Sequence, residues 1–389
     1  MSGSFESLMQ ITPRPEFCFS AGQGSWLEDE QGRRYLDFIQ GWAVNTLGHC
    51  PPQLTNAVSA QLNTLINCSP AFYNRPMVEL ADLLTANCEL DEVFFTNSGA
   101  EANEGAIKLA RKWGQLKKSG AFEIITFKNA FHGRTLATMS ACGKEAFAPL
   151  FEPKVSGFSK VPFNNLCAAK AAITDNTVAI MLEPIQGEAG VIPADPQFLS
   201  GLRALADEHN LLLIFDEVQT GIGRCGALFC HQLYDVSPDI MTLGKGIGGG
   251  LPLAALLSKA HCSVFDYGDQ GGTYNGNPVT TSAGIAIMNT LLSSGFIEEV
   301  QQIAHYLKSR LAKLAAKYEF GQIRGEGLLL ALDTGLINAN RIIETAFSNG
   351  LILNAPNQST IRFMPALNLT EQDIDIMIEK LDKAIAVAN

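Results

Sequence analysis

Two short segments of the sequence carry a carboxylate and a lysine in settings that suggest covalent cofactor chemistry. The apolar run Leu211–Phe215 ends at Asp216, and further along the chain Lys245 stands between Gly244 and Gly246. Pyridoxal phosphate needs a lysine amine for a Schiff base and a carboxylate that keeps its ring nitrogen protonated. At an effective dielectric constant near 20, a carboxylate about 4 Å away favours that cation by about 4 kcal/mol. The pair therefore suggests a pyridoxal phosphate site, although a strand-end turn and a solvated loop lysine explain these two residues equally well.

A strand-to-helix junction offers a place for a phosphate group. Ser98, Gly99 and Ala100 follow a predicted strand at 92–95 and open a predicted helix that runs to Lys118. Backbone amides and the helix dipole at such a junction attract anions. An ordinary helix N-cap explains the same residues, but ligands bind beyond the carboxyl ends of parallel strands, which favours a phosphate site.

Two further strand ends carry chemically useful side chains. Phe131 and Arg134 follow a predicted strand at 123–127, where the aromatic ring could stack on a flat cofactor and the guanidinium could bind a carboxylate. Glu183 and Glu188 lie at the end of another strand. Paired carboxylates could act as acid and base on a glycosidic bond, but the nearby cations favour a role as charge partners.

A glycine pattern leaves one alternative from a different class open. Residues 244–249 match the dinucleotide fingerprint GxGxxG, which would suggest an NAD-dependent dehydrogenase. However, Pro252 interrupts the helix that should follow, and the unit comes late in the chain. We therefore weigh the dehydrogenase below the pyridoxal phosphate enzyme.

Composition sets outer limits on function. The chain has 389 residues and a formal net charge of −11, which argues against partners such as nucleic acid or anionic membranes. Nine cysteines, an odd number without paired metal-ligand spacing, indicate reduced thiols in a cytoplasmic protein and no metal site. We find no secretion signal and no apolar stretch of membrane-spanning length.

Strands that alternate with helices predict an α/β fold with a mostly parallel, doubly wound sheet. After about residue 276 the pattern changes to long helices and short strands. We therefore expect a large cofactor-binding domain at 51–276, and a small α+β domain formed by 1–50 and 277–389. Within the small domain, residues 1–50 are expected to be largely irregular.

In combination, these segments resemble the class III, or subgroup II, pyridoxal-phosphate aminotransferases over nearly the whole chain. The resemblance implies a fold-type I enzyme with a large sheet of the seven-stranded type. It rests on several motifs in matching order: Asn97–Glu104, Phe131–Thr135, Glu183–Glu188, Phe215–Gly221, Gly244–Lys245 and Gly272–Pro278.

The resemblance also implies a role for each candidate residue. Lys245 would carry the cofactor and shuttle a proton, and Asp216 would pair with the ring nitrogen. The ring would lie between Phe131 and Val218, with Gln219 at its phenolic oxygen. Phosphate would be bound by the segment at 98–100 and by Thr273 of a second subunit, which implies a homodimer. Substrate carboxylates would be held by Arg134 and Arg362, with Glu188 neutralising Arg362 in one half-reaction.

The implied reaction moves the δ-amino group of N2-acetylornithine to 2-oxoglutarate, as in arginine metabolism. Other amino donors within the same family stay open: 4-aminobutyrate, ornithine, succinylornithine and succinyldiaminopimelate. Two departures from the family pattern bear on this choice. Arg75 stands where related enzymes often carry an acidic residue, and Trp42 stands in a stretch that is usually aliphatic.

Overall fold

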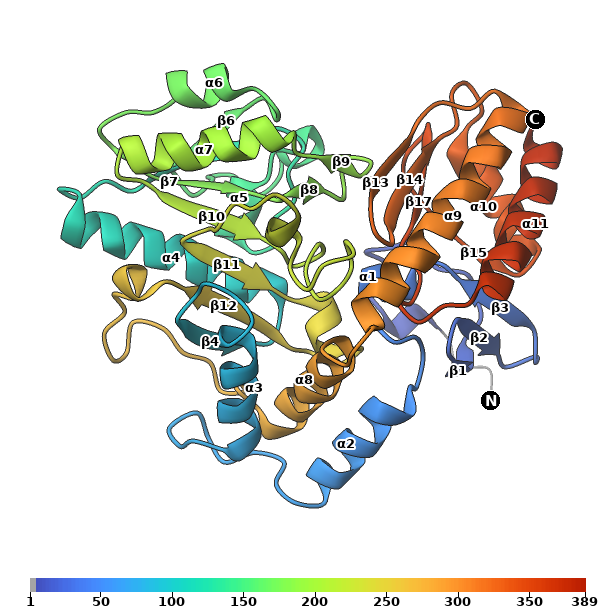
Figure 1. Ribbon diagram of the computed structural model, residues 1–389, viewed down its shortest axis with the longest axis horizontal. Helices are drawn as coiled ribbons and strands as arrows, with labels where there is room; N and C mark the ends of the chain where they lie inside the picture. The colour runs from blue at the N-terminus through green and yellow to red at the C-terminus, as the bar shows by residue number, and fades with distance from the viewer. Residues whose placement is uncertain (1–4) are drawn as a thin grey trace.

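The computed structural model describes residues 5–389, which contain one seven-stranded sheet, two four-stranded sheets and one two-stranded sheet (Figure 1). Across the large sheet the strands follow the order β4 (Glu92–Thr96), β12 (Ala254–Ser258), β11 (Ile240–Leu243), β10 (Leu212–Asp216), β7 (Thr177–Leu182), β5 (Glu123–Phe127) and β6 (Phe158–Val161). β12 is antiparallel to both of its neighbours, whereas the strands from β11 to β6 are mutually parallel. This arrangement confirms the predicted α/β class with a mostly parallel sheet.

Helices cover both faces of the large sheet (Figure 1). On one face α4 (Gly99–Lys117) packs Ile107 and Trp113 against alternate strand residues such as Ile124 and Ile214. On the other face lie α6 (Leu166–Ala171) and α7 (Pro196–Glu208). Because adjacent strand residues point to opposite faces, one buried strand serves both cores.

Several shorter elements connect the strands of this layer. They are α5 (Leu136–Ala141), η2 (Glu145–Phe147), β8 (Ile185–Gln186), β9 (Ile192–Pro193), η3 (Cys230–Leu233), η4 (Lys245–Gly248) and η5 (Ala260–Cys262). Below the sheet, α2 (Pro52–Leu62) and α3 (Arg75–Thr85) pack against α8 (Pro278–Leu291) (Figure 1).

The C-terminal part of the chain forms a second layered unit. Its antiparallel sheet has the order β13 (Ile323–Glu326), β14 (Leu329–Asp333), β17 (Thr360–Phe363) and β16 (Asn354–Asn357). The helices that pack with it are α9 (Phe296–Tyr318), α10 (Ala339–Ser348) and α11 (Glu371–Ala388). The predicted domain boundary near 276 precedes α8 and stays a prediction.

The expectation of an irregular N-terminal segment was wrong. β1 (Phe19–Gln23), β2 (Trp26–Asp29) and β3 (Arg34–Asp37) form a meander whose third strand pairs in parallel with β15 (Leu351–Ile352). These strands are only four or five residues long, and β1 is largely exposed, so the sequence shows no clear alternation of apolar residues.

Directly after β3 the backbone makes a left-handed turn, α1 (Gln40–Ala43). The φ angles of its residues are 48°, 61°, 67° and 64° in chain order. Left-handed backbone disfavours every residue type except glycine by about 1–2 kcal/mol, and only Gly41 is a glycine. The Asp37 carboxylate supports the turn because its Oδ1 accepts the amides of Ile39 and Gln40 at 2.8 and 2.9 Å. Backbone strain held in this way often marks a functional segment.

None of the helices within residues 5–389 combines the length and the apolar character that a membrane crossing requires.

Candidate active site

The candidate residues gather at one edge of the large sheet. Ser98 follows β4, Phe131 follows β5, Glu183 follows β7, Asp216 ends β10 and Lys245 follows β11. Parallel strands place their carboxyl ends at the same edge, and ligands of open α/β sheets bind there. The sheet therefore brings together residues that are far apart in the sequence.

Asp216 is buried and held by three donors. Its Oδ2 accepts from Asn103 Nδ2 at 2.7 Å and lies 2.8 Å from His132 Nδ1, while its Oδ1 accepts the amide of Val218 at 3.1 Å. Asn103 is itself oriented by Thr242, whose hydroxyl donates to Asn103 Oδ1 at 2.7 Å. The carboxylate is thus fixed in one orientation, as a charge partner of a cofactor ring needs to be.

Lys245 begins η4 with a φ of 46° and is half-buried. Burial lowers the pKa of its amine from the ordinary value, and Arg362 acts in the same direction. The carboxylates of Glu188, Asp216 and Glu183 oppose that shift. A lowered pKa leaves more of the amine unprotonated, which is the form that attacks a carbonyl carbon.

Two glycines let the segments of the site approach one another. A Cβ atom on Gly99 would lie 2.6 Å from Val218 Cγ1, and a Cβ on Gly244 would lie 3.1 Å from the same atom. The first turn of α4 therefore packs directly against Val218 and the residue before Lys245. Glu101 accepts the amides of Asn97 and Ser98 at 2.8 and 2.9 Å, which leaves the amides of Gly99 and Ala100 at the open end of the helix.

The short element that begins at Lys245 bears on the dinucleotide alternative. η4 is a four-residue 3-10 turn that is followed by Gly249, which has a left-handed φ of 57°. The dinucleotide fingerprint requires a glycine-rich turn that opens a long α-helix, whose N-terminus then binds the pyrophosphate. The segment at 244–249 does not have this form, so the structure does not support a dinucleotide-binding site of a dehydrogenase here.

Glu188 and Arg362 form an ion pair beside Lys245. Arg362 is fully buried on β17, and its Nη1 lies 2.7 Å from Glu188 Oε1. Lys144 Nζ lies 3.1 Å from the other carboxylate oxygen. Burial would raise the pKa of Glu188, but Arg362 and Lys144 hold it at about 2, well below its ordinary value of 4.5.

Arg362 is also fixed by neutral groups. Its Nε donates to Asn354 Oδ1 at 2.9 Å, and its Nη1 donates to the Gly187 carbonyl at 2.8 Å and to Gln219 Oε1 at 3.3 Å. Arg362 Nη2 and Gln219 Nε2 are buried and have no partner within residues 5–389. Buried donors of this kind are normally satisfied, so these two are suited to acceptors on a bound molecule.

The other predicted substrate arginine is more open. Arg134 is exposed, its guanidinium carbon lies 5.5 Å from the centre of the Phe147 ring, and it forms no ion pair within the described chain. Trp42, on the left-handed turn, is about half exposed and places its ring 5.5 Å from the Arg362 guanidinium carbon. Thr273 lies in an exposed turn, and the nearby Asn275 accepts a hydrogen bond from Asn97 at 2.9 Å.

Glu183 is buried deeper at the same edge. Its Oε1 accepts the Phe131 amide at 2.9 Å and its Oε2 accepts the Gly187 amide at 3.3 Å. Burial raises its pKa to about 7, and the Asp216 carboxylate adds to that effect. The carboxyl group therefore ties the Phe131 segment to the Gly187 segment.

Three residues of the site received no role from the sequence analysis. Asn103 and His132 hold Asp216, and Lys144 holds Glu188. Asn103 is the one polar side chain that α4 turns into the sheet, a signal that helical periodicity could have given. The position of Lys144 after α5 gives no such signal.

One group of three potential metal ligands exists within the described residues. Ligand atoms of Asp239, His261 and Cys262 lie within 4.8 Å of one another, but Asp239 already pairs with Arg203 at 2.8 Å and approaches Lys259 at 3.7 Å. Two cations at that carboxylate disfavour a further one.

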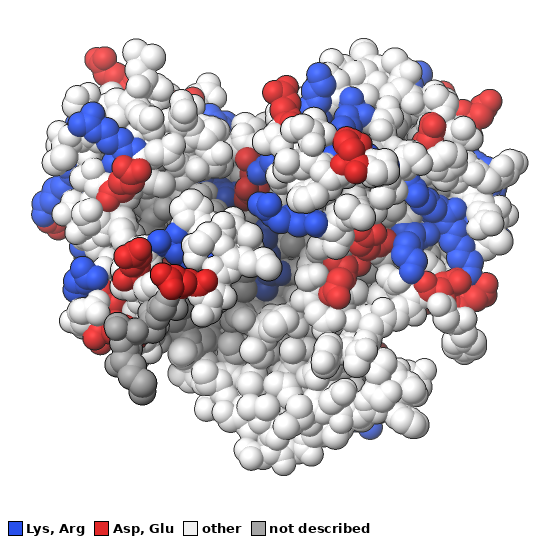
Figure 2. Space-filling view, turned by 180° about the vertical axis from the view of Figure 1, so that it is seen from behind, with Lys and Arg blue, Asp and Glu red and all other residues white. Residues whose placement is uncertain are grey.

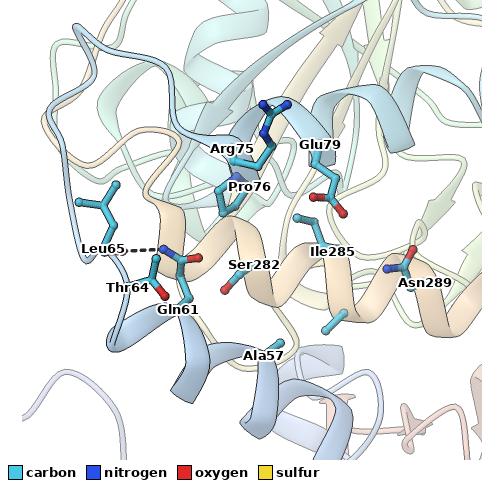
Figure 3. Close-up of a pocket in the computed structure, with 11 residues that line it drawn as sticks. Ala57, Gln61, Thr64, Leu65, Arg75, Pro76, Glu79, Ser282, Ile285 and Asn289 are labelled. Atoms are coloured by element: carbon cyan, nitrogen blue, oxygen red, sulfur yellow. Dashed lines mark hydrogen bonds between the residues drawn. The ribbon is translucent and has the colours of Figure 1, made fainter.

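A cavity of about 520 Å³ lies between α2, α3 and α8 (Figure 3). Figure 3 shows Arg75, Pro76 and Glu79 of α3 across from Ser282, Ile285 and Asn289 of α8, with the Gln61 side chain donating to the Leu65 carbonyl at 2.8 Å. Arg75 thus lies on the wall of this cavity rather than among the charges around Lys245.

Comparison with known proteins gives one family. The model of the class-III aminotransferases matches residues 10–385. Acetylornithine aminotransferase 2 of Bordetella pertussis is 56% identical over 383 residues, covering 98% of this chain and 97% of that protein. N-acetylornithine aminotransferase of Stenotrophomonas maltophilia has a TM-score of 0.84 at 34% identity, with 96% of each chain covered.

The ornithine aminotransferase of Toxoplasma gondii has a TM-score of 0.93 at 29% identity, with 97% of this chain and 91% of that chain covered. That structure shows partial occupancy of PLP at its active site. The fold is that of the fold-type I transferases. By its sequence over nearly the full length and by its fold, the chain belongs to the class-III aminotransferase family.

Proposed function

We propose that this aminotransferase uses pyridoxal 5'-phosphate to move the δ-amino group of N2-acetylornithine to 2-oxoglutarate, giving N-acetylglutamate 5-semialdehyde and glutamate. The observation that carries the proposal is the Arg362–Glu188 pair, which lies next to Lys245 and leaves one guanidinium nitrogen unpartnered. The names of the curated relatives support the same reaction.

The residues present fit pyridoxal phosphate. Gln219 Nε2 is an unpartnered buried donor suited to the phenolic oxygen, and Asp216 is a fixed carboxylate suited to a protonated ring nitrogen. A Cβ on Gly99 or Gly244 would fill the narrow space beside Val218, as expected where a backbone approaches a ligand closely. When bound, the cofactor supplies an electron sink that stabilises negative charge on the substrate carbon.

The chain's own residues then divide the work. Lys245 Nζ would hold the cofactor covalently and later carry a proton to and from the substrate carbon. Asp216 would keep the ring nitrogen protonated, with Asn103 and His132 fixing its orientation. Phe131 and Val218 would limit ring movement, and the amides of Gly99 and Ala100 would bind the phosphate.

The two half-reactions need different charges at the same place. N2-acetylornithine must present its δ-amine, so its α-carboxylate would lie far from Lys245 and within reach of Arg134. Glutamate must present its α-amine, so its α-carboxylate would lie close and bind Arg362. Glu188 would neutralise Arg362 while N2-acetylornithine is bound, and would move away from Arg362 while glutamate is bound.

We further propose a homodimer in which Thr273 contributes to the phosphate site of its partner. Exposed apolar side chains lie at the end of α2 and in the segment that follows it. They are Leu62, Ile66, Phe72 and Tyr73. Figure 2 shows this lower part of the molecule as a broad area with few charged groups. An uncharged apolar surface of this kind is typical of an interface between subunits. Mixing a Lys245→Ala chain with an inactive Thr273 variant should restore some activity, because the heterodimer holds one intact site.

A donor panel tests the reaction. Purified enzyme with pyridoxal phosphate and 2-oxoglutarate should give its highest kcat/KM with N2-acetylornithine, ahead of ornithine, 4-aminobutyrate, succinylornithine and succinyldiaminopimelate. Borohydride should fix the cofactor on Lys245, and Lys245→Ala should abolish that adduct. A higher kcat/KM for 4-aminobutyrate would overturn the substrate but leave the cofactor chemistry standing. The cytoplasmic location stays a prediction.

A further inference from the structure

Lys144 gives Glu188 a second cation that the reaction scheme does not use. Glu188 Oε2 lies 3.1 Å from Lys144 Nζ, and Glu188 Oε1 lies 2.7 Å from Arg362 Nη1. The side chains of Lys144 and Glu188 are 27% and 25% exposed, whereas that of Arg362 is fully buried. A carboxylate bound to two cations through separate oxygens can leave one of them and keep the other.

Two aromatic rings hold the ammonium group of Lys144 in place. Its Nζ lies 5.3 Å from the ring centre of Phe131 and 6.0 Å from that of Phe147. Ring faces attract a cation at such distances. Lys144 is therefore held at the Glu188 oxygen that does not contact Arg362.

The substrate carboxylates compete with Glu188 for Arg362. An α-carboxylate that binds Arg362 through two parallel hydrogen bonds uses the unpartnered Nη2 and also Nη1, so it takes the place of Glu188 Oε1. Two carboxylates at one guanidinium also repel each other. Moving Glu188 to a place without a counter-charge would leave a partly buried charge uncompensated, which is strongly unfavourable. A ligand whose only carboxylate binds Arg134 leaves the Glu188–Arg362 pair intact and avoids this step.

We propose that Lys144 is a positioning residue that keeps the charge of Glu188 compensated while a substrate α-carboxylate occupies Arg362. It thereby favours ligands with two carboxylates over ligands with one. This inference rests on the proposed function, because it assumes that Arg362 and Arg134 bind the two ends of glutamate.

Binding of inert ligands to the holoenzyme tests the role of Lys144 without turnover. Glutarate has two carboxylates, and N2-acetylnorvaline is acetylornithine without its δ-amine. By calorimetry, Lys144→Met should weaken glutarate about tenfold while leaving N2-acetylnorvaline within about twofold. Lys144→Arg, which keeps the charge, should restore glutarate binding. Lys154→Met is the matched control, because Lys154 pairs with Glu152 at 3.5 Å and should change neither ligand.

A double-mutant comparison separates the charge role from a structural one. In a Glu188→Gln background, Lys144→Met should no longer change the affinity for glutarate, because there is no charge left to compensate. The inference is overturned if Lys144→Met weakens the binding of both ligands equally, or if it still weakens glutarate binding in the Glu188→Gln background. It is also overturned if Lys144→Arg does not restore glutarate binding. If Lys144→Met lowers the unfolding midpoint, Lys144→Gln provides the same comparison.

The two proposals fail in different ways. If wild-type enzyme does not bind N2-acetylnorvaline and the donor panel excludes N2-acetylornithine, the proposed substrate is wrong. If wild-type enzyme binds both ligands but Lys144→Met changes neither, only the role of Lys144 is wrong.

Discussion

Replacing Glu188 by glutamine tests how the ion pair governs substrate choice. Glu188→Gln removes one charge but keeps nearly the same shape, so Arg362 loses its counter-charge while the surrounding packing stays. Arg362 is fully buried and its Nη2 is unpartnered, so its charge then attracts any carboxylate that enters the site. N2-acetylornithine would be drawn into a misplaced position with its carboxylate at Arg362, whereas glutamate would bind with less competition.

The size of the effect follows from the charges. Burial would raise the pKa of Glu188, but Arg362 and Lys144 hold it at about 2 against an ordinary 4.5. At about 1.4 kcal/mol per pKa unit, this difference corresponds to about 3 kcal/mol. Coulomb's law gives about 4 kcal/mol for unit charges about 4 Å apart at an effective dielectric constant near 20. Because Glu188 is one quarter exposed, we take the smaller value.

Single-turnover half-reactions measure the consequence directly. In Glu188→Gln, the ratio of kcat/KM for glutamate to kcat/KM for N2-acetylornithine should rise by roughly a hundredfold, which corresponds to about 3 kcal/mol. Glu188→Asp, which keeps the charge, is the control and should shift the ratio far less. An unchanged ratio in a folded Glu188→Gln enzyme, or a shift toward N2-acetylornithine, would refute the reasoning.

Three further substitutions test other parts of the site. Asp216→Asn should leave the unfolding midpoint unchanged but slow the half-reactions by up to about a thousandfold, since a charge contribution of about 4 kcal/mol is lost; a near-normal stopped-flow rate would contradict this. Burial raises the pKa of Glu183 to about 7, so the folded state binds more protons than the unfolded state between pH 4.5 and 7. The free energy of unfolding of the wild-type protein should therefore fall as pH rises through that window. Thermal unfolding of Glu183→Gln at a series of pH values should lack this decline, and equal slopes would count against it. Gly99→Ala adds a Cβ 2.6 Å from Val218 Cγ1, so it should cost about 1–3 kcal/mol in urea unfolding and weaken cofactor retention during dialysis; normal retention would place the phosphate elsewhere.

The parallel core of the fold could be predicted because its strands are buried on both faces. β10 is a continuous apolar run that ends at Asp216, and α4 begins with a clear capping box at Ser98. Such local signals define both the element and its boundary. The N-terminal meander lacks them, since its strands depend on β15 and on each other rather than on their own pattern.

The candidate site was only partly accessible from the sequence. The residues at strand ends, such as Asp216 and Lys245, could be identified because parallel strands place them at one edge. Their supports could not, because Asn103 and His132 reach Asp216 through tertiary packing over large sequence separations. The same holds for Lys144, whose contact with Glu188 depends on how the segment after α5 folds back.

The pairing of β3 with β15 has a consequence for how the chain folds. β3 is made early in synthesis, but its parallel partner at Leu351–Ile352 is made near the end. During translation the edge of β3 that will face β15 therefore stays open to other strands, and unpaired edges favour aggregation. Pairing over so large a sequence separation is also slow. We therefore expect the N-terminal meander to gain hydrogen-exchange protection late in refolding, after the seven-stranded sheet.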